Sequence, residues 1–271
     1  MRITIKVGSN VLTREDGSLD VTRMSALVDQ IAELRKQGLE VILVSSGAVA
    51  SGRSEMKSLM YTSDSSAHEP YEGRSMDDVD ERQLFSAVGQ AKLINRYFEL
   101  FRDHGIHVGQ VLTTKENFIN DKLYQNQRNC MKVMLENGVL PIVNENDTVS
   151  ITELMFTDND ELSGLITEMM QSDMLIILSN IDGFYDGNPK DEGSRLIPVI
   201  GADEDISKYI QNEKSSAGRG GMHTKSSIAQ NLAKKGIDVI LARGTRENVL
   251  VDLVNDRASV PHTDFVRKTK D

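Results

Sequence analysis

The segment VILVSSGAVASG (41–52) decides the fold class of this chain. Four apolar, mostly β-branched residues end abruptly in Ser45-Ser46-Gly47, and small residues that could begin a helix follow. A buried strand that turns through glycine into a helix is typical of a parallel sheet covered by helices. Three interpretations of the turn are open at first: a serine nucleophile, a cradle for an anion, or a tight connection only.

Composition limits the class of protein. The chain has 271 residues, a formal net charge of −10 and one cysteine, Cys130. The length fits one large α/β domain with two lobes, and a lone cysteine excludes an intramolecular disulfide. The acidic balance argues against a nucleic-acid binder, but it allows a nucleotide ligand, which needs only a few lysines and N–H groups. Without a signal-peptide or transmembrane run, the sequence predicts a cytoplasmic protein that does not contact membranes.

Apolar runs alternate with helical patterns, which predicts an α/β fold: a three-layer αβα sandwich with a mainly parallel central sheet. Strands are predicted at 3–7, 40–44, 106–112, 139–143, 174–178 and 238–241, and helices at 22–37, 81–104, 121–136 and 222–235. Segment 57–80 is polar, rich in Ser and Asp, and follows neither period. It predicts a mobile insertion, which is either a lid or a solvated excursion without a role.

The first motif is IKVGSNVLT (5–13), which places Lys6 in the middle of an apolar strand. An unpaired buried ammonium group is costly, so Lys6 needs a carboxylate partner or an anionic ligand, unless the strand lies at an edge and the side chain reaches solvent. Gly8 at the strand end would let backbone N–H groups approach a ligand closely.

The turn in 41–52 does not match the G-x-S-x-G pattern of a hydrolase nucleophile, and no histidine lies in a recognisable triad context. The serine-nucleophile interpretation is therefore unfavoured. A strand followed by two hydroxyls, a glycine and a helix start presents donors to an anion. A purely structural turn would explain Gly47 but not the paired hydroxyls.

Two acidic clusters, NEND (144–147) and DND (158–160), flank a predicted hairpin at 148–156. The spacing is not that of an EF-hand, and such clusters can be ordinary Asx turns. Two clusters around one hairpin favour a site that holds an amine-bearing substrate and positions lysines.

The last motif is the glycine-rich loop GRGGMHTK (218–225), which precedes a helix. Lys225 lies in the first helical turn, where the helix dipole favours anions rather than cations. A lysine there is explained if it meets a phosphate, although a flexible glycine linker is the simpler interpretation. The spacing is not that of a Walker A loop.

Taken in order, these segments resemble the amino acid kinase family, from the start of the chain to about residue 245. The matching pieces are KVGSNVLT, VSSGAVASGR, AVGQ (87–90), HVGQVLTT (107–114), PIVNEND, DNDELS and GRGGMHTK. The resemblance, which is closest to the glutamate-phosphorylating members, implies ATP-dependent phosphorylation of the γ-carboxylate of L-glutamate to γ-glutamyl phosphate, the first step toward proline. It implies ATP and Mg²⁺ as cofactors, with the metal held mainly by ATP oxygens and water.

The resemblance also implies a role for individual residues. Lys6 and Lys225 would contact the transferring phosphoryl group from two sides, oriented by Asp160 and assisted by the turns at Gly8 and Gly47. The implied substrate-binding residues are Ser46, Asp147, Asn159 and Asn144. The implied nucleotide-binding residues are Lys6, Ser179, Asn180, Arg219, Gly220, Gly221, Met222, His223, Thr224 and Lys225.

A single domain, 1–271, is expected, with a lobe at about 1–170 for the amino acid and one at 171–271 for ATP. The resemblance further implies a homo-oligomer (dimer or tetramer), a complex with the next enzyme of the proline pathway, and a chain without the C-terminal PUA domain of many relatives. Asn180 and His223 depart from the family's usual Asp and Ser. Two alternatives stay open: another carboxylate or phosphate kinase of this fold, and a non-catalytic nucleotide or amino-acid sensor.

Overall fold

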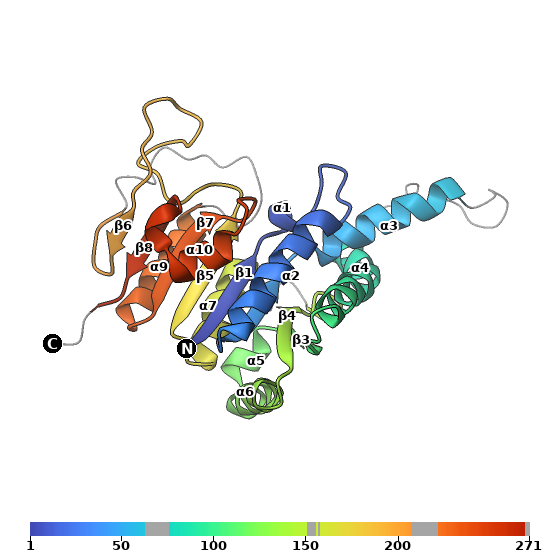
Figure 1. Ribbon diagram of the computed structural model, residues 1–271. Helices are drawn as coiled ribbons and strands as arrows, with labels where there is room; N and C mark the ends of the chain where they lie inside the picture. Colours follow the sequence, from blue (N-terminus) through green and yellow to red (C-terminus); the bar gives the residue numbers. More distant parts are fainter. Residues whose placement is uncertain (63–75, 151–155, 157, 207–221, 269–271) are drawn as a thin grey trace.

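A computed structural model describes residues 1–62, 76–150, 156, 158–206 and 222–268 (Figure 1). Its sheet has eight strands in the order β3-β4-β2-β1-β5-β7-β8-β6. Their bounds are β1 (Arg2–Val7), β2 (Glu40–Ser45), β3 (Val108–Thr113), β4 (Leu140–Glu145), β5 (Met174–Ser179), β6 (Val199–Gly201), β7 (Asp238–Arg243) and β8 (His262–Val266).

The helices that connect and cover the strands are α1 (Ser9–Leu12), α2 (Val21–Lys36), α3 (Ala48–Thr62), α4 (Asp78–Arg102), α5 (Glu116–Ile119), α6 (Asp121–Glu136), α7 (Asn159–Met169), α9 (Met222–Lys234) and α10 (Val249–Asn255). A short 3₁₀ turn, η3, spans Arg257–Ser259. Among the described helices, none combines the length and apolarity needed to cross a membrane.

Strand β1 lies in the middle of the sheet and runs parallel to both neighbours, β2 and β5. Strand β8 runs antiparallel to β7, and every other neighbouring pair in the described sheet is parallel. The prediction of a mainly parallel sheet is confirmed. Because parallel strands end at one edge, the segments after β1, β2, β4 and β5 are brought together there.

The two faces of the sheet follow from the alternation of side chains along β1. Ile3, Ile5 and Val7 pack on one face in a core cluster that contains side chains of α2, α4 and α10. Thr4 and Lys6 therefore point to the opposite face, which α6, α7 and α9 cover. Both faces are buried, so the three-layer αβα sandwich is confirmed.

Segment 57–80 differs from its prediction at both ends, which are helical. Helix α3 runs to Thr62 and α4 begins at Asp78, where the Asp77 side chain caps the helix by accepting from the N–H groups of Val79 and Asp80. Residues 63–75 lie outside the described ranges, so the mobile insertion stays a prediction. The hairpin predicted at 148–156 also falls mostly outside them.

Candidate active site

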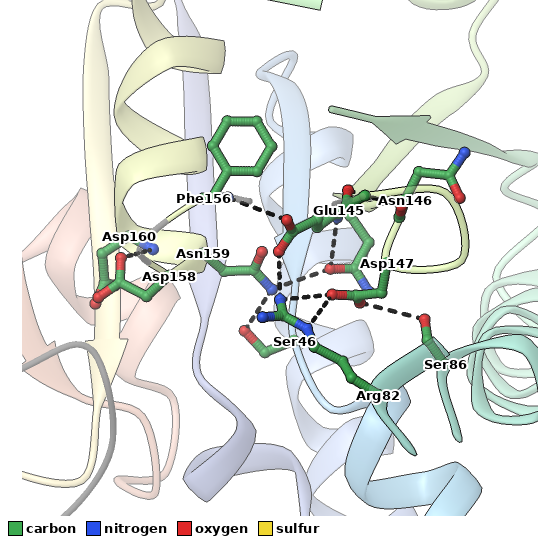
Figure 2. A network of polar contacts seen from close by, with 12 residues as sticks. Ser46, Arg82, Ser86, Glu145, Asn146, Asp147, Phe156, Asp158, Asn159 and Asp160 are labelled. Carbon is green, nitrogen blue, oxygen red and sulfur yellow. Dashed lines mark hydrogen bonds and ion pairs between the residues drawn. The ribbon is translucent and has the colours of Figure 1, made fainter. Parts of the chain in front are cut away.

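The candidate site lies at the carboxyl edge of the sheet, where β1, β2 and β4 end and helices α7 and α9 begin. Ligands of open parallel sheets bind at this edge, and helix N-termini add partial positive charge. The site divides into a cationic centre around Asp160 and an acidic pocket around Asp147, with Asn159 between them (Figure 2).

The cationic centre is built on Asp160 in the first turn of α7. Its two carboxylate oxygens pair with two ammonium groups, Oδ1 with Lys6 Nζ at 2.7 Å and Oδ2 with Lys225 Nζ at 2.8 Å. The Asp160 side chain is only 2% exposed, while those of Lys6 and Lys225 are 7% and 14% exposed. Three residues to which the family resemblance gave one role are thus brought into contact, from β1, α7 and α9.

Electrostatics explain how Asp160 stays charged in this position. Burial alone would raise the pKa of its carboxyl group, but the charges of Lys6 and Lys225 outweigh burial and hold that pKa below its ordinary value. The dipole of α7 acts in the same direction because Asp160 lies in its first turn. The cluster carries one net positive charge, which suits a phosphate ligand.

Asp158 precedes the same helix and caps its first turn. Its Oδ1 accepts from the N–H groups of Asp160 and Glu161, both at 2.9 Å. Burial, and then the nearby Asp160 charge, raise the pKa of Asp158. The second acidic cluster of the sequence is therefore a helix N-terminus, which the periodicity of 159–169 did not reveal.

Gly8 and Gly47, which the resemblance assigned to the site, lie at the ends of β1 and β2. A Cβ on Gly8 would lie 3.4 Å from Lys6 Nζ, and Gly47 has a φ of +101°, which favours glycine. The N–H of Gly8 donates to Leu178 O at 3.3 Å and that of Ser46 to Val7 O at 3.1 Å. These two N–H groups extend the sheet and already have backbone acceptors.

Asn159 joins the turn after β2 to the end of β4. Its Nδ2 donates to Ser46 Oγ at 2.8 Å, to Asn144 Oδ1 at 3.0 Å and to Ser45 O at 3.3 Å. Asn144 Oδ1 also accepts from the N–H of Glu145. The predicted substrate residues Ser46, Asn144 and Asn159 therefore form one hydrogen-bonded group beside Asp160.

The fourth predicted substrate residue, Asp147, lies in the acidic pocket with Glu145. Arg82 of α4 joins the two carboxylates: its Nε donates to Asp147 Oδ1 and its Nη2 to Glu145 Oε2, each at 2.6 Å. Ser86 Oγ donates to Asp147 Oδ2 at 3.2 Å, and the N–H of Phe156 to Glu145 Oε1 at 3.0 Å. Figure 2 shows these groups converging beside Asn159.

Glu145 has the most unusual acidity in this pocket. Burial, and then repulsion from Asp147, raise the pKa of Glu145 to about 7, although Arg82 and the Phe156 N–H act in the opposite direction. The pocket therefore has excess negative charge that is only partly neutralised. A ligand ammonium group would complete the neutralisation.

The predicted nucleotide residues are described in part. Ser179 ends β5, and its Oγ donates to Asn180 Oδ1 at 3.3 Å; Asn180 is exposed. Met222, Thr224 and Lys225 lie in the first turn of α9, as does the backbone of His223. Arg219, Gly220 and Gly221 lie outside the described residues.

Sequence reasoning missed Arg82, Ser86 and Glu145. Glu145 is part of the NEND cluster, but the pattern gave no reason to separate it from its neighbours. Arg82, Ser86 and Gln90 recur every four residues in the helix predicted at 81–104, a polar stripe that could have indicated a buried polar face. Gln90 on this stripe donates to Glu145 O at 3.3 Å.

Solved structures establish the class of fold. The chain resembles UMP kinase from Ureaplasma parvum (TM-score 0.64, 17% identity, 98% of each chain covered) and carbamate kinase from Giardia lamblia bound to AMP-PNP (TM-score 0.67, 16% identity, 98% of each chain covered). At such identities the likeness shows the fold, an α/β sandwich that these two small-molecule kinases also have.

Sequence comparisons then give the family. Residues 1–243 match the amino acid kinase family, and the chain belongs to that family. It is 62% identical to glutamate 5-kinase of Bacteroides thetaiotaomicron over 269 residues, and 46% identical to glutamate 5-kinase of Chlorobaculum tepidum over 250 residues. These alignments cover 99% and 92% of the chain, and 71% and 65% of the two relatives.

Proposed function

We propose that the chain transfers the γ-phosphoryl group of ATP to the γ-carboxylate of L-glutamate, giving γ-glutamyl phosphate for the first step of proline biosynthesis. The observation that carries this proposal is the pair of lysines on the two oxygens of Asp160, next to a pocket with excess negative charge. The names of the relatives at 62% and 46% identity support the choice of glutamate.

Glutamate would bind with its ammonium group toward Asp147 and its γ-carboxylate toward Asp160. The Ser46, Asn144 and Asn159 group lies between these two points and offers hydroxyl and amide groups to the acceptor. Asp147 supplies the charge that an ammonium group requires, since its carboxylate is buried and held in place by Arg82 and Ser86. The arrangement selects an acceptor with a cation at one end and a carboxylate at the other.

ATP would bind across α9, with its phosphates at Lys225 and its nucleoside near Ser179 and Asn180. The proposed nucleotide site also includes the loop before α9 and the start of that helix, with Arg219, Gly220, Gly221, Met222, His223 and Thr224. Lys6 would meet the transferring group from the sheet side. Nucleotide binding is in keeping with the AMP-PNP complex of the carbamate kinase.

Phosphoryl transfer between these ligands needs no base from the chain. The γ-carboxylate is ionised at neutral pH, and one of its oxygens attacks the γ-phosphorus while the bond to the β,γ-bridging oxygen breaks and ADP leaves. The chain positions the reactants and neutralises charge. Lys6 and Lys225 approach the phosphoryl oxygens, and Asp160 directs both ammonium groups by pairing with them.

Mg²⁺ is proposed to arrive with the nucleotide. In the described part of the chain, no group of three or more His, Cys, Asp or Glu side chains could hold a metal ion, and both Asp160 oxygens already pair with lysines. These residues fit a metal that ATP oxygens and water hold, which would add charge neutralisation at the phosphates.

The proposal is tested by glutamate-dependent hydroxamate formation with ATP, Mg²⁺ and hydroxylamine, together with detection of ADP. Glutamate should support turnover, whereas carbamate, UMP and aspartate should not. Turnover with another acceptor in that panel, and none with glutamate, would identify a different kinase of this fold. A folded chain that binds ATP or glutamate without turnover would instead be a sensor.

We also propose a cytoplasmic location, which rests on the sequence alone, and two properties that the family resemblance implies: assembly into a dimer or tetramer, and a complex with the next enzyme of the pathway. The division into an amino-acid lobe (about 1–170) and an ATP lobe (171–271) is part of the same proposal. Light scattering at several protein concentrations would measure the oligomeric state.

A further inference from the structure

Arg82 is a charged residue of the acidic pocket that comes from α4 rather than from the sheet edge. Its guanidinium contacts Asp147 and Glu145 through two different nitrogens, and Ser86, one turn further along the same helix, contacts the other oxygen of Asp147. Both oxygens of Asp147 are therefore held by α4. The direction of this carboxylate depends on a helix that lies away from the Lys6–Asp160–Lys225 cluster.

Charge gives Arg82 a second effect on Asp147. The Glu145 and Asp147 side chains are 4% and 6% exposed, so their mutual repulsion is poorly screened. With both ionised, the two carboxylates and one guanidinium leave a single net negative charge, which one ligand ammonium group would balance. Without Arg82, this repulsion would lose its counter-charge, and Asp147 would lose the hydrogen bond that holds its Oδ1.

Helix α4 is also fixed relative to the turn that holds Ser46. It crosses α3 in backbone contact: a Cβ on Gly89 would lie 1.8 Å from Ala48 O, and one on Gly52 would lie 1.8 Å from Phe85 O. Ala48 directly follows Gly47, so the crossing ties α4 to the turn after β2. The position of Arg82 is thereby set by the same elements that present Ser46.

We propose that Arg82 positions Asp147 for the ammonium group of the acceptor, so that α4 sets the affinity for glutamate. The inference rests on the proposed function, because it requires that Asp147 receives the ammonium group. Arg82 is a positioning residue in this account. It acts through Asp147 and does not touch the transferring phosphoryl group.

The test compares steady-state kinetics and melting temperatures of wild type, Arg82→Gln, Arg82→Lys and the double variant Arg82→Gln/Glu145→Gln. Arg82→Gln should raise the glutamate KM about tenfold or more, while the ATP KM and kcat stay within about twofold. Arg82→Lys should give an intermediate KM, because lysine keeps the charge but loses the fork that spans two carboxylates.

The double variant separates positioning from stability. In Arg82→Gln, the buried carboxylates of Glu145 and Asp147 repel each other without a counter-charge. Glu145→Gln removes this repulsion, so the melting temperature of the double variant should return toward the wild-type value while its glutamate KM stays raised. Arg96→Gln is the matched control: Arg96 lies on the same helix and pairs at 2.9 Å with the exposed Glu99, and its loss should leave all constants unchanged.

The inference would be overturned, with the proposed function still standing, by an unchanged glutamate KM in folded Arg82→Gln or by a wild-type glutamate KM in the double variant. A rise in ATP KM or a fall in kcat equal to the change in glutamate KM would also contradict a role confined to the acceptor. If wild type forms no γ-glutamyl hydroxamate, the proposed function and the inference both fail.

Discussion

At the scale of single residues, the buried charges of the site explain one another. Lys6 lies in the central strand and Lys225 in a helix N-terminus, which are unfavourable places for an unpaired cation. Asp160 provides a carboxylate partner for both ammonium groups. The three side chains together keep one net positive charge, which could pair with a phosphate. Removing either lysine would therefore take a positive charge away from the proposed phosphoryl site and would also change the electrostatic field at the other lysine.

Lys225→Ala should lower kcat about 100-fold or more and change the glutamate KM only a few-fold, because the contact with the phosphoryl group strengthens as charge develops in transfer. Lys235→Ala is the control, since Lys235 pairs with Glu168 on the surface at 2.7 Å and such pairs contribute little. The measurement is steady-state kinetics with ADP detection. Equal kcat in both variants would remove Lys225 from the mechanism.

Glu145 predicts a pH dependence of stability. Its pKa is about 7 in the folded chain against an ordinary value of 4.5, so the folded state binds more protons than the unfolded state between these values. Its contribution to the free energy of unfolding therefore falls as pH rises from 4.5 to 7. Above pH 7 the contribution of Glu145 to the free energy of unfolding stays low.

Glu145→Gln should abolish this dependence, because glutamine resembles the protonated acid at every pH. The melting temperature of the variant minus that of wild type should be higher at about pH 8 than at about pH 5.5, by about 2 °C or more. Calorimetry at the two pH values measures the difference, in which the other titrating groups cancel. A difference that is equal at both pH values, or larger in the acidic buffer, contradicts the raised pKa.

At the scale of elements, strong periodicity gave reliable predictions and polar helix ends did not. Helix α6 spans the predicted 121–136, and the central strands lie within two residues of their predicted bounds. Helices α7 and α4 begin after Asp158 and Asp77, whose side chains cap the first turn. A capping aspartate followed by acidic residues looks like a loop in sequence, so the pattern does not predict α7 and places the start of α4 at 81 instead of 78.

The site divides in the same way between what a pattern indicates and what only packing decides. A lysine in an apolar strand needs a counter-charge, so the sequence indicated that Lys6 had a partner. It identified Asp160 only through the family resemblance. The pairing of Arg82 with Glu145 and Asp147 depends on how α4 packs in the folded chain. Arg82 is separated from these two residues by 63 and 65 positions in the sequence, so no local pattern indicates the pairing.

The crossing of α3 and α4 predicts a large effect for a small substitution. Gly89→Ala would place a Cβ 1.8 Å from Ala48 O, so the two helix backbones must separate, despite the higher helix propensity of alanine. We expect a loss of about 1–3 kcal/mol or more in unfolding free energy, measured by urea denaturation. A rise in glutamate KM should accompany it because Ala48 follows the Gly47 turn.

Gly193→Ala is the control for this prediction. A Cβ on Gly193 would meet no atom of the described residues within 4 Å, and Gly193 lies in a connecting segment, so its substitution should leave stability and KM unchanged. Equal stability of the two variants would mean that the helices can separate without cost. In that case α4 could not hold Arg82 in a fixed position.

At the scale of the whole molecule, the sheet would separate the two proposed ligand sites and bring their reactive ends together. Strands β1, β2 and β4 lead to the proposed acceptor residues, while β5 and α9 carry the proposed nucleotide residues. The two halves meet at Asp160, which contacts one lysine from each side. Each half should therefore bind its ligand even when the other half is impaired.

Ligand-induced stabilisation in paired variants tests this division. In wild type, AMP-PNP with Mg²⁺ and L-glutamate should each raise the melting temperature by about 5 °C at about 100 times the dissociation constant. At the same ligand concentrations, Asp147→Asn should lose most of the glutamate shift and keep the AMP-PNP shift, because it removes only a charge from the acidic pocket. Lys225→Ala should show the opposite pattern. Loss of both shifts in either variant, in a chain that still unfolds cooperatively, would show that the two sites are not separate.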